Sequence, residues 1–313
     1  MDLNSYQHQA LDTDQVPASA DPGAAAAALI VPLLGLAGEA GQLLSEYKKH
    51  MRDGAAHTLF KERVAEELGD LLWYVSNVAS KFGLTLEEVA QANLEKVQGR
   101  WGSRPSGPHV FDAGFPEHER LPRRFEIELT EVRVGEAVKI RVLLDGRQIG
   151  ADLTDNAYDP DGYRFHDVFH FALAAVLGWS PVTRAIMKRK RKGDPMKDEV
   201  EDGGRAAVIE EGVAALVFDY ARQHDFLEGV TELDYSLLRA VKGMTSHLEV
   251  SACTIGDWQR AILQAYAAWR QVVAAGSGRV LADLDDRRLS YIAGSNGAAG
   301  VGRPAMSKEP AEA

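Results

Sequence analysis

The segment at residues 64–75 has apolar side chains at helical spacing, which predicts an amphipathic helix with one buried face. Glu67 and Asp70 are three residues apart, so both project from one side of this helix. Carboxylates next to an apolar stripe are costly to remove from water unless a positive charge meets them. The pattern therefore predicts that the two carboxylates face Lys or Arg, or a hard divalent cation such as Mg2+.

A second amphipathic stretch at residues 34–49 precedes the first. Glu39, Gln42 and Glu46 lie on one stripe of the expected helix, at i, i+3 and i+7. Glycine and alanine around them permit close approach by another helix or by a ligand. Two antiparallel helices of this kind can bring four oxygen-bearing side chains to one metal cluster, as helical bundles do.

Two further helices complete an expected all-α bundle over residues 1–102. The first is short and lies within residues 2–15, whereas the last begins at the capping box Thr85-Leu-Glu-Glu88. The helix that contains Glu39 begins either in the alanine tract at residues 24–29 or at Pro32, because proline is tolerated in a first turn but kinks a helix interior.

The pattern changes beyond residue 122. Residues 125–129 and 138–144 alternate apolar and polar side chains, which predicts strands, and Asp145-Gly146 predicts a hairpin to residues 147–152. Helical patterns follow at residues 163–178, 205–222, 235–244 and 257–273. The expected fold is mainly α, with an N-terminal helical bundle and a C-terminal α+β domain in which a small antiparallel sheet precedes helices.

The chain of 313 residues is long enough for two domains. Residues 103–122 are rich in Pro, Gly and His and are expected to form a linker. We therefore place the domains at residues 1–102 and 123–293. Residues 294–313 have little to bury and predict a disordered tail.

Composition narrows the classes of function. The formal charge of −11 argues against broad nucleic-acid binding, and the single Cys253 excludes an internal disulfide. A lone cysteine and no basic leader favour a reducing cytoplasm over secretion. The uncharged stretch at residues 22–38 is short for a membrane span, contains Pro32 and leads directly into Glu39, so we expect no membrane partner.

The C-terminal half contains a possible second site. His166 and His170 are four residues apart on one helical face with Asp167 beside them, and Glu210 and Glu211 lie on a later helix. This spacing permits joint metal ligation. It equally suits histidines that make polar contacts in a core, and both interpretations remain open.

A basic run at residues 188–192 is the sharpest charge feature of the chain. Three interpretations remain open for it. The run is solvated, it pairs with the acidic cluster at residues 198–202, or it meets a phosphate-rich ligand such as a nucleotide or RNA.

The order Glu39-x-x-Gln42 then Glu67-x-x-Asp70 resembles the Glu-x-x-Glu…Glu-x-x-Asp signature of the MazG-like all-α nucleoside triphosphate pyrophosphohydrolases. Short motifs around these residues also resemble the family, over about the first third of the chain, at residues 3–7, 35–41, 66–74 and 93–96. Gln42 departs from the pattern, which has Glu there.

The resemblance implies a dimer or larger homo-oligomer that splits nucleoside triphosphates into monophosphate and pyrophosphate with Mg2+, for which Mn2+ can substitute. It implies that Glu39, Glu67 and Asp70 are catalytic and, with Gln42, ligate the metal. The substrate contacts it implies are Lys48, Lys49, Trp73, Asn93 and Lys96.

Two other functions fit the same residues. Because Gln42 brings no charge, the first domain can be a nucleotide-sensing module with weakened catalysis. Alternatively the domain with His166 and His170 is the catalyst, and the N-terminal bundle serves as a dimerisation platform.

Overall fold

The computed structural model describes residues 1–16, 22–101, 110–135 and 137–293, and these form two compact units, Met1–Gln98 and Gly99–Ala313. The first unit holds α1 (Leu3–Leu11), α2 (Pro22–Asp53), a 3-10 turn η1 (Gly54–Ala56), α3 (Phe60–Lys81) and most of α4 (Leu86–Trp101). The expected all-α bundle is confirmed. The tail expected at residues 294–313 lies outside the described residues.

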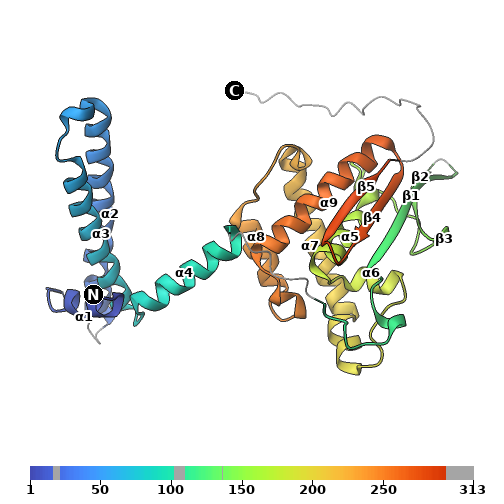
Figure 1. Cartoon of the computed structure of the whole chain (residues 1–313), viewed down its shortest axis with the longest axis horizontal. Helices are drawn as coiled ribbons and strands as arrows, with labels where there is room; N and C mark the ends of the chain where they lie inside the picture. Colours follow the sequence, from blue (N-terminus) through green and yellow to red (C-terminus); the bar gives the residue numbers. More distant parts are fainter. Residues whose placement is uncertain (17–21, 102–109, 136, 294–313) are drawn as a thin grey trace. The chain divides into compact units, whose positions relative to one another are not determined.

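The first unit is built on α2 and α3, which run side by side and are joined by η1 (Figure 1). Helix α2 begins before Pro32, so the alanine tract belongs to it and Pro32 lies inside the helix. A Cβ atom on Gly35 would overlap the Tyr74 ring, which means that the two helices approach closely only because residue 35 is glycine.

Hydrogen bonds fix α1 and α4 onto this pair. Gln7 donates from Nε2 to Ser80 Oγ (2.8 Å) and to the Leu84 carbonyl (2.9 Å), and its Oε1 accepts from the Leu86 amide (2.7 Å). The predicted capping box is present, because the Glu88 amide donates to Thr85 Oγ1 while the Thr85 amide donates to Glu88 Oε2.

The second unit contains a five-stranded antiparallel sheet in the order β3-β2-β1-β4-β5. The strands are β1 (Arg124–Val134), β2 (Ala137–Leu144), β3 (Arg147–Gln148), β4 (Gly278–Asp283) and β5 (Arg288–Ile292). The predicted hairpin is confirmed, with Asp145 and Gly146 at φ values of 50° and 71°, the pair of positive angles that a type I′ turn requires.

Strands β4 and β5 were not predicted from the sequence. The 6 residues of β4 include three consecutive apolar side chains, Val280 to Ala282, and the 5 residues of β5 alternate only in part, so neither shows a clear strand pattern. These segments form strands because β4 pairs with a distant part of the chain, where Ile127 of β1 lies opposite Val280 of β4. A pattern read locally does not contain that information.

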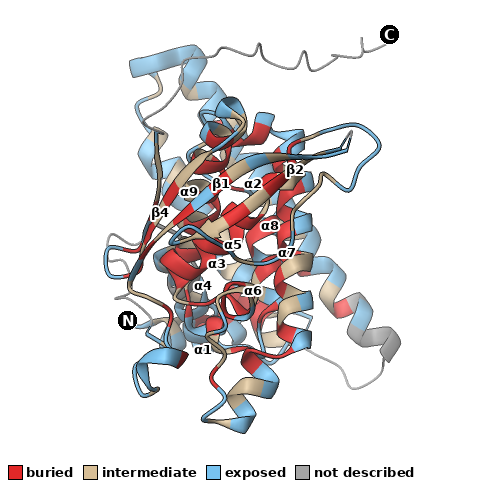
Figure 2. Ribbon diagram, turned by 90° about the vertical axis from the view of Figure 1, so that its right-hand side faces the viewer, coloured by how far each residue is buried: buried red, intermediate tan, exposed pale blue. Residues whose placement is uncertain are grey.

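Helices complete the second unit. They are α5 (Asp167–Leu177), α6 (Pro181–Ile186), α7 (Gly204–Gln223), α8 (Tyr235–Met244) and α9 (Ile255–Ala275). Every residue of α5 is buried, because the helix packs between α9 and strands β4 and β5 while also contacting α6 and α7 (Figure 2). The four predicted helical stretches thus coincide with α5, α7, α8 and α9.

The second part of the expected linker packs into the C-terminal unit, which corrects its assignment as a linker. Asp112 and Leu121 are 2% and 1% exposed. The Asp112 carboxylate accepts from the Leu121 amide (2.8 Å) and from Arg184 Nη2 (2.8 Å), and also pairs with Arg123. The segment is therefore a loop that a few buried side chains anchor in the C-terminal unit. Residues 102–109 lie outside the described residues.

The basic run at residues 188–192 pairs with acidic residues at one position. Arg191 is fully buried and donates from Nη2 to Asp202 Oδ1 (2.7 Å), and its Nη2 also lies 2.6 Å from Glu249 Oε1. The interpretation that the run pairs with the acidic cluster is thus confirmed for Arg191. Since two carboxylates neutralise it, this guanidinium is not offered to an external phosphate.

We predict that Gly35→Ala destabilises the α2–α3 pair by about 1–3 kcal/mol, the usual cost of overpacking a tight contact. Faster hydrogen exchange in α2 and α3, followed by mass spectrometry, would report it. Gly38→Ala is the matched control on the same helix. Nothing lies within 4 Å of its added methyl group, so it should slow exchange slightly through better helix propensity. Equal exchange in the two variants would contradict the prediction.

Candidate functional site

Three carboxylates converge from the two long helices of the first unit. Glu39 comes from α2, and Glu67 and Asp70 come from α3. One ligand oxygen of each lies within 4.8 Å of the others. Glu67 is buried, Glu39 is half-buried and Asp70 is exposed, so the group is open to solvent on one side.

The group carries negative charge that the protein does not neutralise. Burial, the charge of Glu39 and a hydrogen bond shared with Glu39 raise the pKa of Glu67 above its ordinary value. Within the described part of the chain, no Lys or Arg forms an ion pair with Glu39, Glu67 or Asp70. Several oxygen donors that lack a positive partner fit a hard divalent cation.

Gln42 joins this group through its amide nitrogen. Its Nε2 donates to Glu39 Oε2 at 2.7 Å. The amide thus stabilises a carboxylate of the cluster, whereas a glutamate at this position would repel it. For Gln42 to ligate a cation through oxygen, the amide must turn over.

The basic residues near the end of α2 have different surroundings. Lys49 pairs with the buried Glu46, whose second oxygen lies 3.4 Å from His57 Nε2. Glu46 is thereby occupied and does not extend the carboxylate group. Lys48 is exposed and remains accessible to a phosphate.

The remaining predicted contacts are spread along α3 and α4. Trp73 donates from Nε1 to Thr13 Oγ1 at 2.8 Å and packs edge-on against Tyr74, so its indole nitrogen has a partner within the unit. Asn93 is exposed on α4. The side chain of Lys96 lies outside the described residues.

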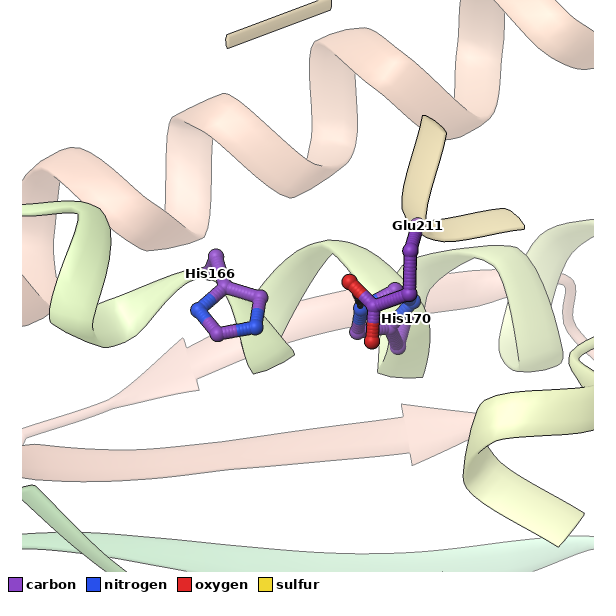
Figure 3. Close-up of side chains that lie close together, drawn as sticks. All are labelled: His166, His170 and Glu211. Atoms are coloured by element: carbon purple, nitrogen blue, oxygen red, sulfur yellow. Dashed lines mark ion pairs between the residues drawn. The ribbon is translucent and has the colours of Figure 1, made fainter. Parts of the chain in front are cut away.

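A second group lies in the C-terminal unit. His166 ends the turn η3 (Tyr163–Phe165), His170 lies on α5 and Glu211 lies on α7, and their ligand atoms are within 4.8 Å of one another (Figure 3). The turn is held in place because Trp269 donates from Nε1 to the Gly162 carbonyl (3.2 Å). Gly162, at φ 87°, leaves room for that indole ring.

Glu210 lies beneath this group with no exposed surface. Its Oε1 accepts from Ser180 Oγ (2.7 Å) and from His170 Nδ1 (2.8 Å), and its Oε2 accepts from the Val182 amide (2.8 Å). Burial alone would lower the pKa of His170, but the charge and hydrogen bond of Glu210 outweigh it and raise that pKa to about 10.

The sequence singled out His166, His170 and Glu211 of this group, with Asp167 and Glu210 beside them, but not the residues that orient them. Tyr163 contributes its carbonyl to His166 Nδ1 (2.9 Å) and stacks its ring on the imidazole. Ser180 caps α6 by accepting from the Thr183 amide while its hydroxyl donates to Glu210. The Ser180-Pro181 pair signals a helix start, but that signal does not reveal the contact across 30 residues.

Three carboxylates that converge between neighbouring helices form an acidic group that could hold a metal ion, an arrangement that helical bundles use. The sequence matches agree. Residues 32–104 match the MazG nucleotide pyrophosphohydrolase domain, and residues 106–295 match the MazG C-terminal domain. The chain belongs to the MazG family and is a nucleoside triphosphate pyrophosphohydrolase.

One curated relative is the Gene 37 protein of Mycobacterium phage L5. It is 35% identical over 102 residues, which cover 32% of this chain and 89% of that protein. No solved structure matches the chain.

We predict that Gln42→Glu raises the affinity for a divalent cation on the order of tenfold, because carboxylate sites are tuned by ligand charge. Calorimetric titration with Mn2+ would measure it. Gln98→Glu, at an exposed position of α4, adds the same charge away from the group and should leave the affinity unchanged. Unchanged affinity in Gln42→Glu would show that residue 42 does not face the ion.

Proposed function

We propose that the N-terminal unit hydrolyses nucleoside triphosphates between the α- and β-phosphates with Mg2+, giving monophosphate and pyrophosphate. Mn2+ is expected to substitute. The observation that carries the proposal is the unneutralised convergence of Glu39, Glu67 and Asp70 in a MazG-family chain. Standard or damaged ribo- and deoxyribonucleotides are the candidate substrates.

The charge balance explains why this site needs a cation. A triphosphate with about four negative charges is repelled by three carboxylates. Mg2+, when held by Glu39, Glu67 and Asp70, screens the phosphates and makes a bound water more acidic. A glutamate oxygen of Glu39 or Glu67 that does not ligate the ion can accept the proton of the attacking water.

The substrate contacts follow from what remains accessible. Lys48 and Asn93 are exposed, and with Lys96 they are the groups we assign to the phosphates. Trp73 lies next to the carboxylates on α3 and is assigned to the base. Lys49 is the weakest of the expected contacts, because Glu46 already holds its ammonium group.

A nucleotide-sensing role is the second candidate, and the Gln42 contact favours it. The amide donates to Glu39 where the family signature places a carboxylate, so the group has one charge fewer. A weaker metal site binds a nucleotide–metal complex but cleaves it slowly.

We predict that Glu67→Gln lowers pyrophosphate release by at least about 100-fold, the lower range for losing a general base. A panel of ribo- and deoxyribonucleoside triphosphates with Mg2+ should be assayed for monophosphate plus pyrophosphate against diphosphate plus phosphate. Glu62→Gln, at an exposed position on the same helix, is the control and should keep wild-type rates.

The panel also separates the alternatives. Nucleotide binding without turnover in the wild type would establish the sensing role. Turnover that survives Glu67→Gln but disappears in His170→Ala would move catalysis to the C-terminal unit and overturn the assignment.

We also propose that the protein is a cytoplasmic homodimer through α2 and α3. Many large apolar side chains on these helices are exposed: Ile30, Val31, Leu33, Leu34, Leu44, Tyr47, Met51, Leu68 and Leu72. Residues Ala28–Ala56 are also long and apolar enough to cross a membrane by length and composition. We favour a second copy as the partner because the same helix carries Glu39, which has no cationic partner among the described residues and which a bilayer core would not accept unpaired.

Light scattering at micromolar concentration should give the mass of a dimer, and Leu34→Lys with Leu44→Lys should shift it toward the monomer. These side chains are 68% and 71% exposed, so the substitutions spare the interior of the unit. Val208→Lys is the control, since Val208 is 71% exposed on the other unit. A monomeric wild type would refute the dimer, and flotation with vesicles would replace it with a membrane partner.

A further inference from the structure

We propose that His166, His170 and Glu211 form a second metal site, selective for a divalent transition-metal ion such as Zn2+. The site lies wholly in the C-terminal unit and is independent of the proposed hydrolysis. Two imidazole nitrogens and one carboxylate oxygen are donors that suit Zn2+, whereas the three oxygens of the first site suit Mg2+.

The hydrogen bonds of the two histidines assign the nitrogen that each can offer. His166 Nδ1 lies 2.9 Å from the Tyr163 carbonyl, which can only accept, so this nitrogen carries a proton. His170 Nδ1 lies 2.8 Å from Glu210 Oε1 and donates to that carboxylate. Both rings therefore present Nε2, and both have the outer partner that metal-ligating histidines have in proteins.

His170 Nε2 is the observation that points to a ligand. The ring is completely buried, yet this nitrogen has no hydrogen-bond partner among the residues that the structure describes. It lies 3.4 Å from Glu211 Oε2, which is longer than a hydrogen bond. Two atoms bound to one tetrahedral Zn2+ at about 2.0–2.1 Å lie roughly 3.4 Å apart. The spacing thus suits two ligands of one ion.

The surroundings orient the rings and leave an approach from solvent. Tyr163 stacks on His166 with ring centroids 4.5 Å apart and an interplanar angle of 9°. The Glu211 side chain is 45% exposed, and Figure 3 shows its carboxylate next to the His170 ring. Three protein ligands with one exposed side leave a coordination position for water or a ligand oxygen.

Negative charge around the two rings favours a cation. Glu210 and Glu211 contact His170, and Asp167 Oδ1 lies 3.4 Å from His166 Nε2. Three carboxylates thus surround two imidazoles. The competing account is that His170 carries a second proton and bridges Glu210 and Glu211 as an ion pair, with no metal. In the first account a metal ion binds His170 Nε2, and in the second a proton does.

The experiment is Zn2+ binding to the full chain carrying Glu39→Gln and Glu67→Gln, which disables the first site. Competition with a chromophoric chelator gives the affinity, and Co2+ absorption reports coordination geometry. We expect one equivalent with a tetrahedral or five-coordinate spectrum. Glu211→Gln should weaken Zn2+ binding by more than the roughly 10- to 100-fold typical of losing an outer partner.

Matched variants keep the result interpretable. Glu228→Gln makes the same change at an exposed glutamate, and His118→Gln removes an exposed histidine, so both should bind as the parent does. Equal affinity in Glu211→Gln and Glu228→Gln, or no uptake at all, would overturn the proposal. Glu211→Gln changes a partly exposed side chain, so it tests the site without removing a buried ring.

Nitrogen-15 NMR of the histidine rings gives a second readout. Zn2+ should shift Nε2 of His166 and His170 while Nδ1 of each stays protonated, because the Tyr163 carbonyl and Glu210 accept those protons. Zinc bound through Nδ1, or His170 resonances that do not respond to Zn2+, would refute the assigned geometry and leave the ion-pair account.

Discussion

A carboxylate removed from water needs donors or a positive charge nearby, and Glu210 is the point where this constraint acts on the C-terminal unit. His170 of α5, the Ser180 hydroxyl and the Val182 amide all donate to it from below or beside α7. Three helices are thereby fixed at one side chain. Removing one partner of such a buried pair typically costs about 3–5 kcal/mol. Glu67 faces the same constraint in the first unit but, among the described residues, receives no comparable set of donors, which supports the proposal that this unit takes its positive charge from an ion.

In both units a buried carboxylate needs a positive charge or donors nearby, but the side chains that surround it differ. Oxygen donors on α2 and α3 gather beside a solvated surface, where a hard ion with its own water shell fits. Imidazole nitrogens at the start of α5 are oriented by hydrogen-bond partners. This fixed geometry favours binding of a softer ion such as Zn2+. Since the donor sets differ in kind, the two centres need not compete for the same metal, and each can be emptied without the other.

Local periodicity accounts for what the sequence predicted well. Glu67 and Asp70 lie at helical spacing on α3. Glu39 joins them because α2 and α3 are consecutive in the chain and pack side by side. Long-range pairing accounts for what it did not predict. The spacing of His166 and His170 marked them as candidates together with Glu210, but the contact between His170 and Glu210 spans 40 residues. Strands β4 and β5 depend on β1, and the loop anchored by the buried Asp112 depends on Arg184, which lies 72 residues away.

The register of β1 against β4 has a consequence for synthesis. The first unit, Met1–Gln98, is compact by itself, so it can fold while the ribosome is still translating the rest. The edge of β1 that pairs with β4 has no partner until β4 has been synthesised. The ribosome must first translate the chain from Val134, the last residue of β1, to Asp283, the last residue of β4. At about 5–20 residues per second this wait is on the order of ten seconds. During it the β1–β2 hairpin presents an apolar face and an open edge, the combination that nascent-chain chaperones shield from aggregation.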